Sequence, residues 1–315
     1  MSTWLRRASR WPRWRRELPR TVVTRTGVAI WPAIAAARAA QVDARVPFWI
    51  VDQGQVLRAG SVARRHLWAL GRWQHALQID SAGVTLTLPA AERSAFLAEA
   101  NAVLREQGLI LAWRDETYPL LAEDGGVLLA TVERAASRFW GTLTFGAHCN
   151  GYVADAADRP QALWIARRSF SKSTDPGLLD NLIGGGVPFG QTPTETVVRE
   201  GDEEAGLTPE QMRGLSPGRI LHLTRDIPEG FQHEWTSVYD LSLPADWIAH
   251  NRDGEVHSHT LMPLVEAFER AANAEMTVDA TLVTLDFALR WRLLPPNQHE
   301  LLAEAAAGLW HGIAS

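Results

Sequence analysis

The sequence contains almost no cysteine and no long apolar run. Its 315 residues include a single cysteine, Cys149, which excludes an intrachain disulfide framework and a thiolate-rich zinc site. No apolar segment approaches the roughly 20 residues that a membrane-spanning helix needs, so we expect no membrane partner. An apolar secretion signal is also missing from the first residues. Together these absences favour a cytoplasmic protein that folds in a reducing compartment.

The chain also lacks an excess of positive charge. It has 31 Lys and Arg residues against 36 Asp and Glu residues, a net charge of −5, which argues against nucleic acid as a partner. Basic residues gather instead in residues 1–25, where eight arginines accompany a single acid, Glu17. We predict that residues 1–25 form a disordered tail. A transit peptide, or a segment that touches a membrane surface or nucleic acid, is the alternative.

Length and hydrophobic patterning indicate two folded domains, because 315 residues exceed the usual size of one domain. Residues 26–137 combine short strand patterns with a helical pattern at Ala90–Gln107, which predicts a smaller α/β domain. The Ala-rich run Pro32–Ala44 also predicts a helix. In residues 138–315, strand patterns precede helical ones such as Leu261–Ala274. This order predicts a larger domain with a mixed sheet between helical layers.

A glycine-rich loop that leads into a short helix carries the strongest chemical signal. Thr192 is placed to be the N-cap, Pro193 the first helical residue, and Glu195 the partner that completes a capping box. Gly206 supplies a left-handed stop. The spacing therefore predicts a helix from Pro193 to Ala205.

Three carboxylates share one face of this helix. Glu200, Glu203 and Glu204 stand at positions i, i+3 and i+4. They repel one another unless a cation lies among them, and Mg²⁺ prefers such oxygen ligands. Arg199 is placed to reach Glu203 one turn later, and Gly201 inside the helix indicates close packing there. An ordinary exposed acidic helix is the alternative for these residues taken alone.

The segment resembles the Nudix box, in which a glycine, five residues, a glutamate and seven residues precede the pattern Arg-Glu-apolar-x-Glu-Glu-x-Gly-apolar. Counting back from Arg199 places the first glycine at Gly185. The second half of the box matches at Arg199, Glu200, Glu203, Glu204, Gly206 and Leu207. Gln191 stands where the first glutamate belongs, and Gly201 replaces an apolar residue. A phosphate-binding P-loop is excluded because the loop lacks a Gly-Lys-Ser/Thr ending.

Segments outside the box resemble the Nudix proteins related to thiamine pyrophosphokinase. The resemblance runs from about Pro47 to near the C-terminus and depends on the order of several short segments, among them Trp113–Tyr118, Gly146–Val153, Trp164–Ser169, Lys172–Gly177 and Asn251–Val256. It implies a Nudix α/β/α sandwich with a mixed sheet, preceded by a smaller α/β N-terminal domain. It also implies hydrolysis of thiamine diphosphate, or of its damaged analogues, to the monophosphate.

The resemblance further implies roles for individual residues. Glu200, Glu203 and Glu204 would hold Mg²⁺ or Mn²⁺, with the carbonyl of Gly185 as a further ligand. Glu255 matches a glutamate that serves as ligand or base from outside the box in several Nudix enzymes. The candidate catalytic residues are thus Glu200, Glu204, Glu255 and Arg199.

Basic residues just before the loop are candidates for binding the substrate phosphates. We predict this role for Arg167, Arg168 and Lys172. Solvated basic residues at a strand end are the alternative.

Two other functions stay open from the sequence. One is a Nudix hydrolase that acts on a nucleoside diphosphate derivative. The other is a Nudix-fold metabolite sensor without catalysis, which Gln191 favours and the intact carboxylate trio disfavours. The N-terminal domain has three candidate roles: it caps the active site, forms a homodimer, or stabilises the fold.

Overall fold

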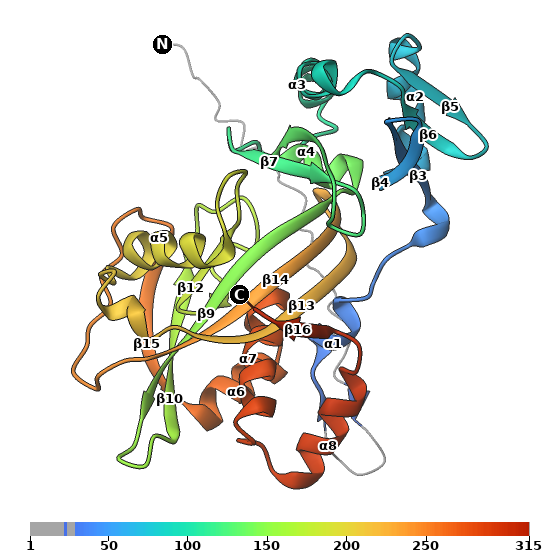
Figure 1. The fold of residues 1–315 in the computed structure, drawn as a ribbon. Helices are drawn as coiled ribbons and strands as arrows, with labels where there is room; N and C mark the ends of the chain where they lie inside the picture. Colours follow the sequence, from blue (N-terminus) through green and yellow to red (C-terminus); the bar gives the residue numbers. More distant parts are fainter. Residues whose placement is uncertain (1–21, 24–28, 315) are drawn as a thin grey trace, which may run out of the picture.

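The computed structural model describes residues 22–23 and 29–314. It contains an N-terminal part and a larger C-terminal part (Figure 1). The predicted tail lies outside the described residues, except for strand β1 (Val22–Val23), which pairs with β2 (Ala29–Ile30). Within residues 22–23 and 29–314, no helix is long and apolar enough to cross a membrane.

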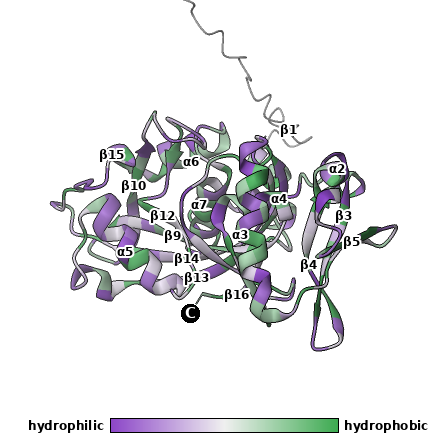
Figure 2. Ribbon diagram, turned by 90° about the horizontal axis from the view of Figure 1, so that it is seen from above, coloured by the Kyte–Doolittle hydropathy of each residue, from purple (hydrophilic) through white to green (hydrophobic). Residues whose placement is uncertain are grey.

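The N-terminal part combines a four-stranded sheet, a β-hairpin and one long helix. Its elements are β3 (Arg45–Asp52), β4 (Gln55–Ala63), α2 (Leu67–Leu70), β5 (Leu77–Asp80), β6 (Gly83–Leu86), α3 (Ala90–Glu106), β7 (Thr117–Leu121), β8 (Leu128–Glu133) and α4 (Arg134–Trp140). The sheet order is β4-β3-β6-β5, and β7 pairs with β8. Helix α4 contacts β4 on one side and the C-terminal sheet on the other, so it lies between the two parts (Figure 2).

The C-terminal part is built on an eight-stranded mixed sheet. Its elements are β9 (Leu143–Ala154), β10 (Pro160–Arg168), β11 (Leu179–Asp180), β12 (Ile183–Gly186), α5 (Pro193–Ala205), β13 (Ser216–Ile227), β14 (Gly230–Ser242), β15 (Val256–Pro263), α6 (Leu264–Ala272), α7 (Val278–Arg290), α8 (Pro296–Ala305) and β16 (Trp310–Ile313). The order is β11-β10-β9-β14-β13-β16, with β12 paired to β9 and β15 to β10. Only the β9–β14 pair is parallel within this described sheet.

Helices cover both faces of this sheet, as the predicted layers require. Adjacent strand residues point to opposite faces, and Val238 and Tyr239 accordingly belong to two different apolar cores. The core that contains Val238 is closed by α6, α7 and α8, whereas the core that contains Tyr239 is closed by α5 (Figure 1). The α/β/α sandwich is therefore confirmed.

The packing differs from the expected domain boundaries at both ends of residues 26–137. Helix α1 (Pro32–Ala36) packs in the core of the C-terminal part, where the Trp31 ring lies 6.3 Å from that of Phe268. Phe139 and Trp140, which the sequence placed in the second domain, are buried in the N-terminal core. From Trp31 onward, the described chain first packs on the C-terminal part, then forms the N-terminal part, and then returns to the C-terminal part.

Two predicted helices are shorter than the sequence suggested. The Ala-rich run Pro32–Ala44 is helical only to Ala36 within the α1 segment, because the Ala37 carbonyl accepts the Thr224 N–H at 2.9 Å and the chain continues along β13. This tertiary contact outweighs the helix propensity of alanine. The helix predicted at Leu261–Ala274 begins three residues late because its first turn is the end of β15, paired with β10.

A buried ionic contact attaches α7 to the sheet. The Arg290 guanidinium donates to Asp240 at 2.7 Å and to Asp286 at 2.6 Å. Both carboxylates are almost fully buried, with exposures of 2% and 0%. Arg290 therefore compensates both buried charges, and Arg219 also pairs with Asp286.

We predict that Arg290→Met lowers the free energy of unfolding by about 3–5 kcal/mol, because two buried carboxylates lose a shared cation. Arg270→Met is the matched control, since it breaks exposed ion pairs with Glu266 and Glu275 and should change stability little. Urea denaturation followed by circular dichroism measures both variants. Equal losses in the two variants would contradict the prediction.

Candidate active site

Helix α5 begins and ends where the sequence predicts. The Thr192 hydroxyl accepts the Glu195 N–H at 3.2 Å, and the Glu195 carboxylate accepts the Thr192 N–H at 2.8 Å, so the capping box is confirmed. Gly206 ends the helix with a φ of +71°. Gly201 packs closely, as expected, because an added Cβ there would lie 3.1 Å from the Met212 side chain. The position of the whole helix is thus fixed by local and packing interactions.

The glycine-rich loop is in part the edge strand β12. It pairs with β9, and Gly185 lies opposite Ala147. Helix α5 packs against both strands. A Cβ atom at Gly185 would overlap the carboxylate of Glu200. Glycine at this position therefore leaves the space that the Glu200 carboxylate occupies.

Glu204 is the most buried of the three helix carboxylates, with an exposure of 5%. It accepts the N–H of Gly184 at 2.9 Å. Burial raises the pKa of Glu204 well above its ordinary value, although the nearby charge of Lys172 opposes this. Burial likewise raises the pKa of Glu200, against the opposing charge of Arg199. Both carboxylates are thus costly to ionise without a neighbouring cation.

Arg199 holds the other carboxylates of the helix. Its guanidinium donates to Glu200 at 2.8 Å and to Glu203 at 2.7 Å, as the sequence predicted for Glu203. Gln191, which replaces the first glutamate of the Nudix box, accepts from the Arg199 Nε at 3.4 Å and from the Thr196 hydroxyl at 3.2 Å. Gln191 therefore helps to orient Arg199.

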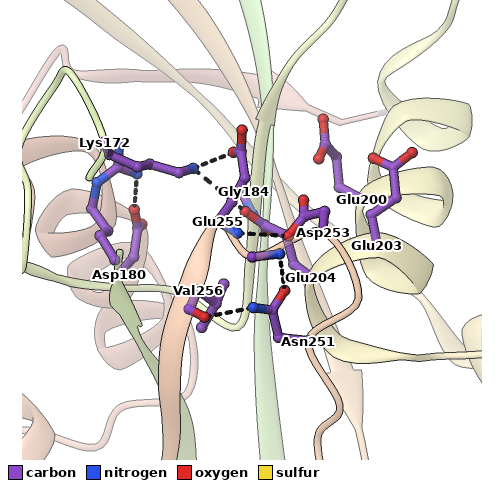
Figure 3. Close-up of polar contacts among 12 residues, drawn as sticks. Lys172, Asp180, Gly184, Glu200, Glu203, Glu204, Asn251, Asp253, Glu255 and Val256 are labelled. Carbon is purple, nitrogen blue, oxygen red and sulfur yellow. Dashed lines mark hydrogen bonds and ion pairs between the residues drawn. The ribbon is translucent and has the colours of Figure 1, made fainter. Parts of the chain in front are cut away.

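Lys172 joins the helix to a second acidic segment (Figure 3). Its ammonium forms an ion pair with Glu255 and lies 3.9 Å from the Glu204 carboxylate. The Glu255 backbone is fixed by its N–H, which donates to Asp253 at 2.8 Å. Burial raises the pKa of Glu255, but the hydrogen bond and charge of Lys172 outweigh it and the pKa is lowered. Lys172 is the sole lysine of the sequence, so every other basic side chain near the site is an arginine or a histidine.

The four glutamates form two pairs, each around one protein cation. Arg199 neutralises one pair and Lys172 the other. In this arrangement no three Asp, Glu, His or Cys side chains of the described residues converge closely enough to hold one ion. The donors still fit a hard divalent cation, because they are all carboxylate oxygens, and those of Glu200 and Glu204 lie beside the glycine strand β12. An ion held by Glu200, Glu203, Glu204 and the Gly185 carbonyl would compete with these protein cations.

A cavity of about 260 Å³ lies beside these carboxylates, between the two parts of the protein. The C-terminal part contributes, among others, Glu200, Glu203, Glu255, Lys172 and Gly184 to Gly186. The N-terminal part contributes Arg114, Glu116, Tyr118, Arg134 and Arg138. The candidate site is therefore a cleft that neither part forms alone.

The three predicted phosphate-binding residues have different surroundings. Lys172 and Arg168 line the cavity, whereas Arg167 does not. The Arg167 guanidinium donates instead to the Gly177 carbonyl at 2.7 Å. Arg168 donates to the Asp180 carboxylate at 2.8 Å and to two backbone carbonyls of the loop between β10 and β11. The pairing of β10 with β15 shifts register between Arg167 and Arg168, where the two side chains take different surroundings.

Sequence reasoning missed an acidic cluster elsewhere in the cavity wall. Glu234 of β14 pairs with Arg138 at 3.1 Å. Asp279 of α7 pairs with Arg225 at 3.4 Å and accepts from Gln232 at 3.1 Å. No motif signals these residues, because they come from elements far apart in the sequence and meet only through the fold.

We predict that Lys172→Met destabilises the metal-free protein by about 3 kcal/mol at pH 8 and by much less at pH 5. Loss of the ammonium raises the pKa of Glu204 further above its unfolded value. A carboxyl group with a raised folded-state pKa favours folding while protonated, and this contribution disappears as pH rises through that pKa. Urea unfolding in EDTA at both pH values measures the difference.

The double variant Lys172→Met/Glu204→Gln is the control, because it removes the carboxyl group that titrates. Its stability relative to Glu204→Gln alone should not change between pH 5 and pH 8. The same pH dependence in Lys172→Met as in wild type would show that Lys172 does not compensate Glu204.

Comparison with known proteins finds a matching family for each part of the chain. Residues 150–281 match the NUDIX domain, and residues 33–144 match a domain of unknown function (DUF4743). The chain is 34% identical over 208 residues to Nudix hydrolase 20, chloroplastic, and to Nudix hydrolase 24, chloroplastic, both of Arabidopsis thaliana. Each alignment covers 65% of this chain, and 55% and 56% of those two proteins respectively. The chain thus spans about half the length of the curated relatives it matches.

A solved structure adds a further likeness. The crystal structure of DR0079 from Deinococcus radiodurans is 24% identical, covers 53% of this chain and 97% of that chain, and has a TM-score of 0.40. The sequence matches agree with the Nudix box on α5 and with the layered sheet around it. The chain is therefore similar to Nudix hydrolases, with residues 150–281 matching the NUDIX domain and the preceding residues 33–144 matching DUF4743.

Proposed function

We propose that this protein uses Mg²⁺ or Mn²⁺ to hydrolyse the diphosphate of a small organic molecule. The observation that carries the proposal is the composition of the cavity wall, in which carboxylates of α5 and Glu255 stand beside Lys172 and several arginines. Carboxylates suit divalent cations, and lysine and arginine suit phosphate oxygens. A metal-bound diphosphate needs both kinds of group at once.

The roles follow from the contacts of each side chain. Divalent ions held by Glu200, Glu203 and Glu204 would neutralise the diphosphate and activate water. Arg199 orients two of these carboxylates. The Glu255 carboxylate lies in the cavity wall and is 44% exposed, which suits a further ligand or a base. Lys172 is placed to contact a phosphate oxygen.

Thiamine diphosphate, or a damaged analogue of it, is the substrate that we propose first. Its support is the resemblance of the flanking segments to the Nudix proteins related to thiamine pyrophosphokinase. The partly buried acids Glu234 and Asp279 in the cavity wall add to it, since carboxylates suit a positive thiazolium ring and an amino group on a pyrimidine. The expected products are thiamine monophosphate and phosphate.

We predict that Glu204→Gln lowers turnover by about 100-fold or more, because several kcal/mol of metal-ion stabilisation depends on the buried carboxylate. Release of phosphate and monophosphate is measured with Mg²⁺ or Mn²⁺ on thiamine diphosphate, its oxidised analogues, ADP-ribose and nucleoside triphosphates. Added EDTA should abolish turnover in wild type. Glu195→Gln is the matched control on the same helix, because Glu195 only caps it.

The panel separates the competing functions. Preferred cleavage of thiamine compounds supports the proposed substrate, and preferred cleavage of ADP-ribose or a nucleotide replaces it while keeping the reaction. A folded protein that binds metal but cleaves no compound points to a metabolite sensor. Activity of Glu204→Gln equal to that of Glu195→Gln would refute the role of the carboxylate.

We also predict that Gly185→Ala lowers kcat by about 100-fold with little change in thermal stability. The added methyl group would overlap the Glu200 carboxylate and displace it, and a displacement of about 1 Å in a catalytic group has an effect of this size. Gly71→Ala is the control, because a Cβ atom there meets nothing within 4 Å. Full activity of Gly185→Ala would show that the position of Glu200 is not critical.

A further inference from the structure

The N-terminal part is fixed directly to the glycine-rich loop. The Thr117 carbonyl at the start of β7 accepts the N–H of Phe189, three residues after β12, at 2.8 Å. Helix α4, which follows the β7–β8 hairpin, contacts β14. Figure 1 shows β7 and α4 across the upper ends of β9 and β14. Side chains of β7 and α4 therefore have fixed positions relative to the carboxylates of α5.

Tyr118 of β7 places a buried hydroxyl group in the cavity wall. The residue is 2% exposed, and within the described residues its hydroxyl has no hydrogen-bond partner. A Cβ atom at Gly186 would overlap that hydroxyl, just as one at Gly185 would overlap Glu200. Adjacent strand positions face opposite ways, so Tyr118 and Glu200 approach β12 from its two faces. A buried hydroxyl without a partner is unfavourable, and an acceptor atom of a ligand would satisfy it.

Two arginines line the same cavity as this hydroxyl. The Arg134 guanidinium lies 5.6 Å from the Tyr118 ring centroid and donates to Glu116 through one of its nitrogens at 3.0 Å. Arg114 reaches across the cleft and donates to the Ser173 hydroxyl, next to Lys172, at 3.2 Å.

One glutamate fixes the backbone beneath both arginines. The Glu133 carboxylate accepts the Arg114 N–H at 2.8 Å and caps α4, which begins at Arg134, through the Ala135 N–H at 2.6 Å. One carboxylate therefore joins the backbone at Arg114 to the start of α4 at Arg134, and both arginines line the cleft.

We propose that Tyr118, Arg134 and Arg114 form an anion-binding wall through which the N-terminal domain completes the active site. Their donors contact the non-bridging oxygens of the substrate diphosphate, beside the carboxylates of α5. This inference rests on the proposed function of the cavity. It assigns the N-terminal domain a direct role in binding the substrate, in place of dimerisation or stabilisation alone.

The chemistry of the wall suits a diphosphate. Planar guanidinium groups donate two parallel hydrogen bonds to phosphate oxygens, which a lysine ammonium does not. Burial raises the pKa of Tyr118 to about 12, so its hydroxyl stays protonated and remains a donor. Donors already in place for negative charge on the departing phosphate stabilise that charge without reorganisation.

Calorimetric titration with inorganic pyrophosphate tests the wall without turnover. The full-length protein is titrated in EDTA, as wild type and as Arg134→Met, Arg114→Met and Tyr118→Phe. Each arginine variant should bind pyrophosphate about 10-fold more weakly, and Tyr118→Phe about 3-fold more weakly. Arg58→Met is the control, because Arg58 lies in the same domain and forms an exposed pair with Glu123; its affinity should equal that of wild type.

Circular dichroism and thermal unfolding establish that each variant is folded. If Arg134→Met fails to fold, Arg114→Met still tests the proposal. The Arg114 side chain donates to Ser173 in an exposed hydrogen bond, and its loss should affect folding little. The proposal is overturned if wild type does not bind pyrophosphate, or if the folded variants bind as tightly as Arg58→Met.

The two proposals fail separately. If the affinity for pyrophosphate depends on Arg114 and Arg134 but no diphosphate is hydrolysed, the proposed function is refuted and the anion-binding wall stands. If the protein hydrolyses a diphosphate but its affinity for pyrophosphate does not depend on these arginines, the anion-binding wall is refuted and the proposed function stands.

Discussion

The buried carboxylate of Glu204 is the constraint on which the arrangement of the site depends. A charge with 5% exposure needs compensation, and two segments supply it: the Gly184 N–H from β12 and the Lys172 ammonium from the loop after β10. Lys172 also pairs with Glu255 before β15. One buried charge therefore links α5 to three other segments and determines where the cavity lies.

The part of the site that the sequence predicted is local. The capping box at Thr192 and Glu195 and the spacing of the three glutamates lie within one helix, whose geometry is the same in any fold. The positions of those carboxylates on one face follow directly. Glu255 is different, since nothing in its neighbourhood marks it. Its candidate role as ligand or base came from the family pattern, and the structure places it beside Lys172.

The rest of the site depends on contacts between distant segments. The pairing of β10 with β15 shifts register between Arg167 and Arg168, and only this tertiary arrangement decides that Arg168, and not Arg167, lines the cavity. Tyr118 and Arg134 reach the site because β7 and α4 dock on the C-terminal sheet. The helix predicted for the Ala-rich run after Pro32 likewise ends early, since carbonyls of that run accept hydrogen bonds from β13.

The balance of charge in the cleft links metal binding to substrate binding. Arg199 and Lys172 each neutralise two carboxylates in the protein alone. A divalent ion on those carboxylates would displace the protein cations and leave them without partners, which is unfavourable by itself. A diphosphate supplies new partners for the same cations. Each ligand thus removes a cost that the other imposes, and this is the condition for two ligands to bind cooperatively at one site.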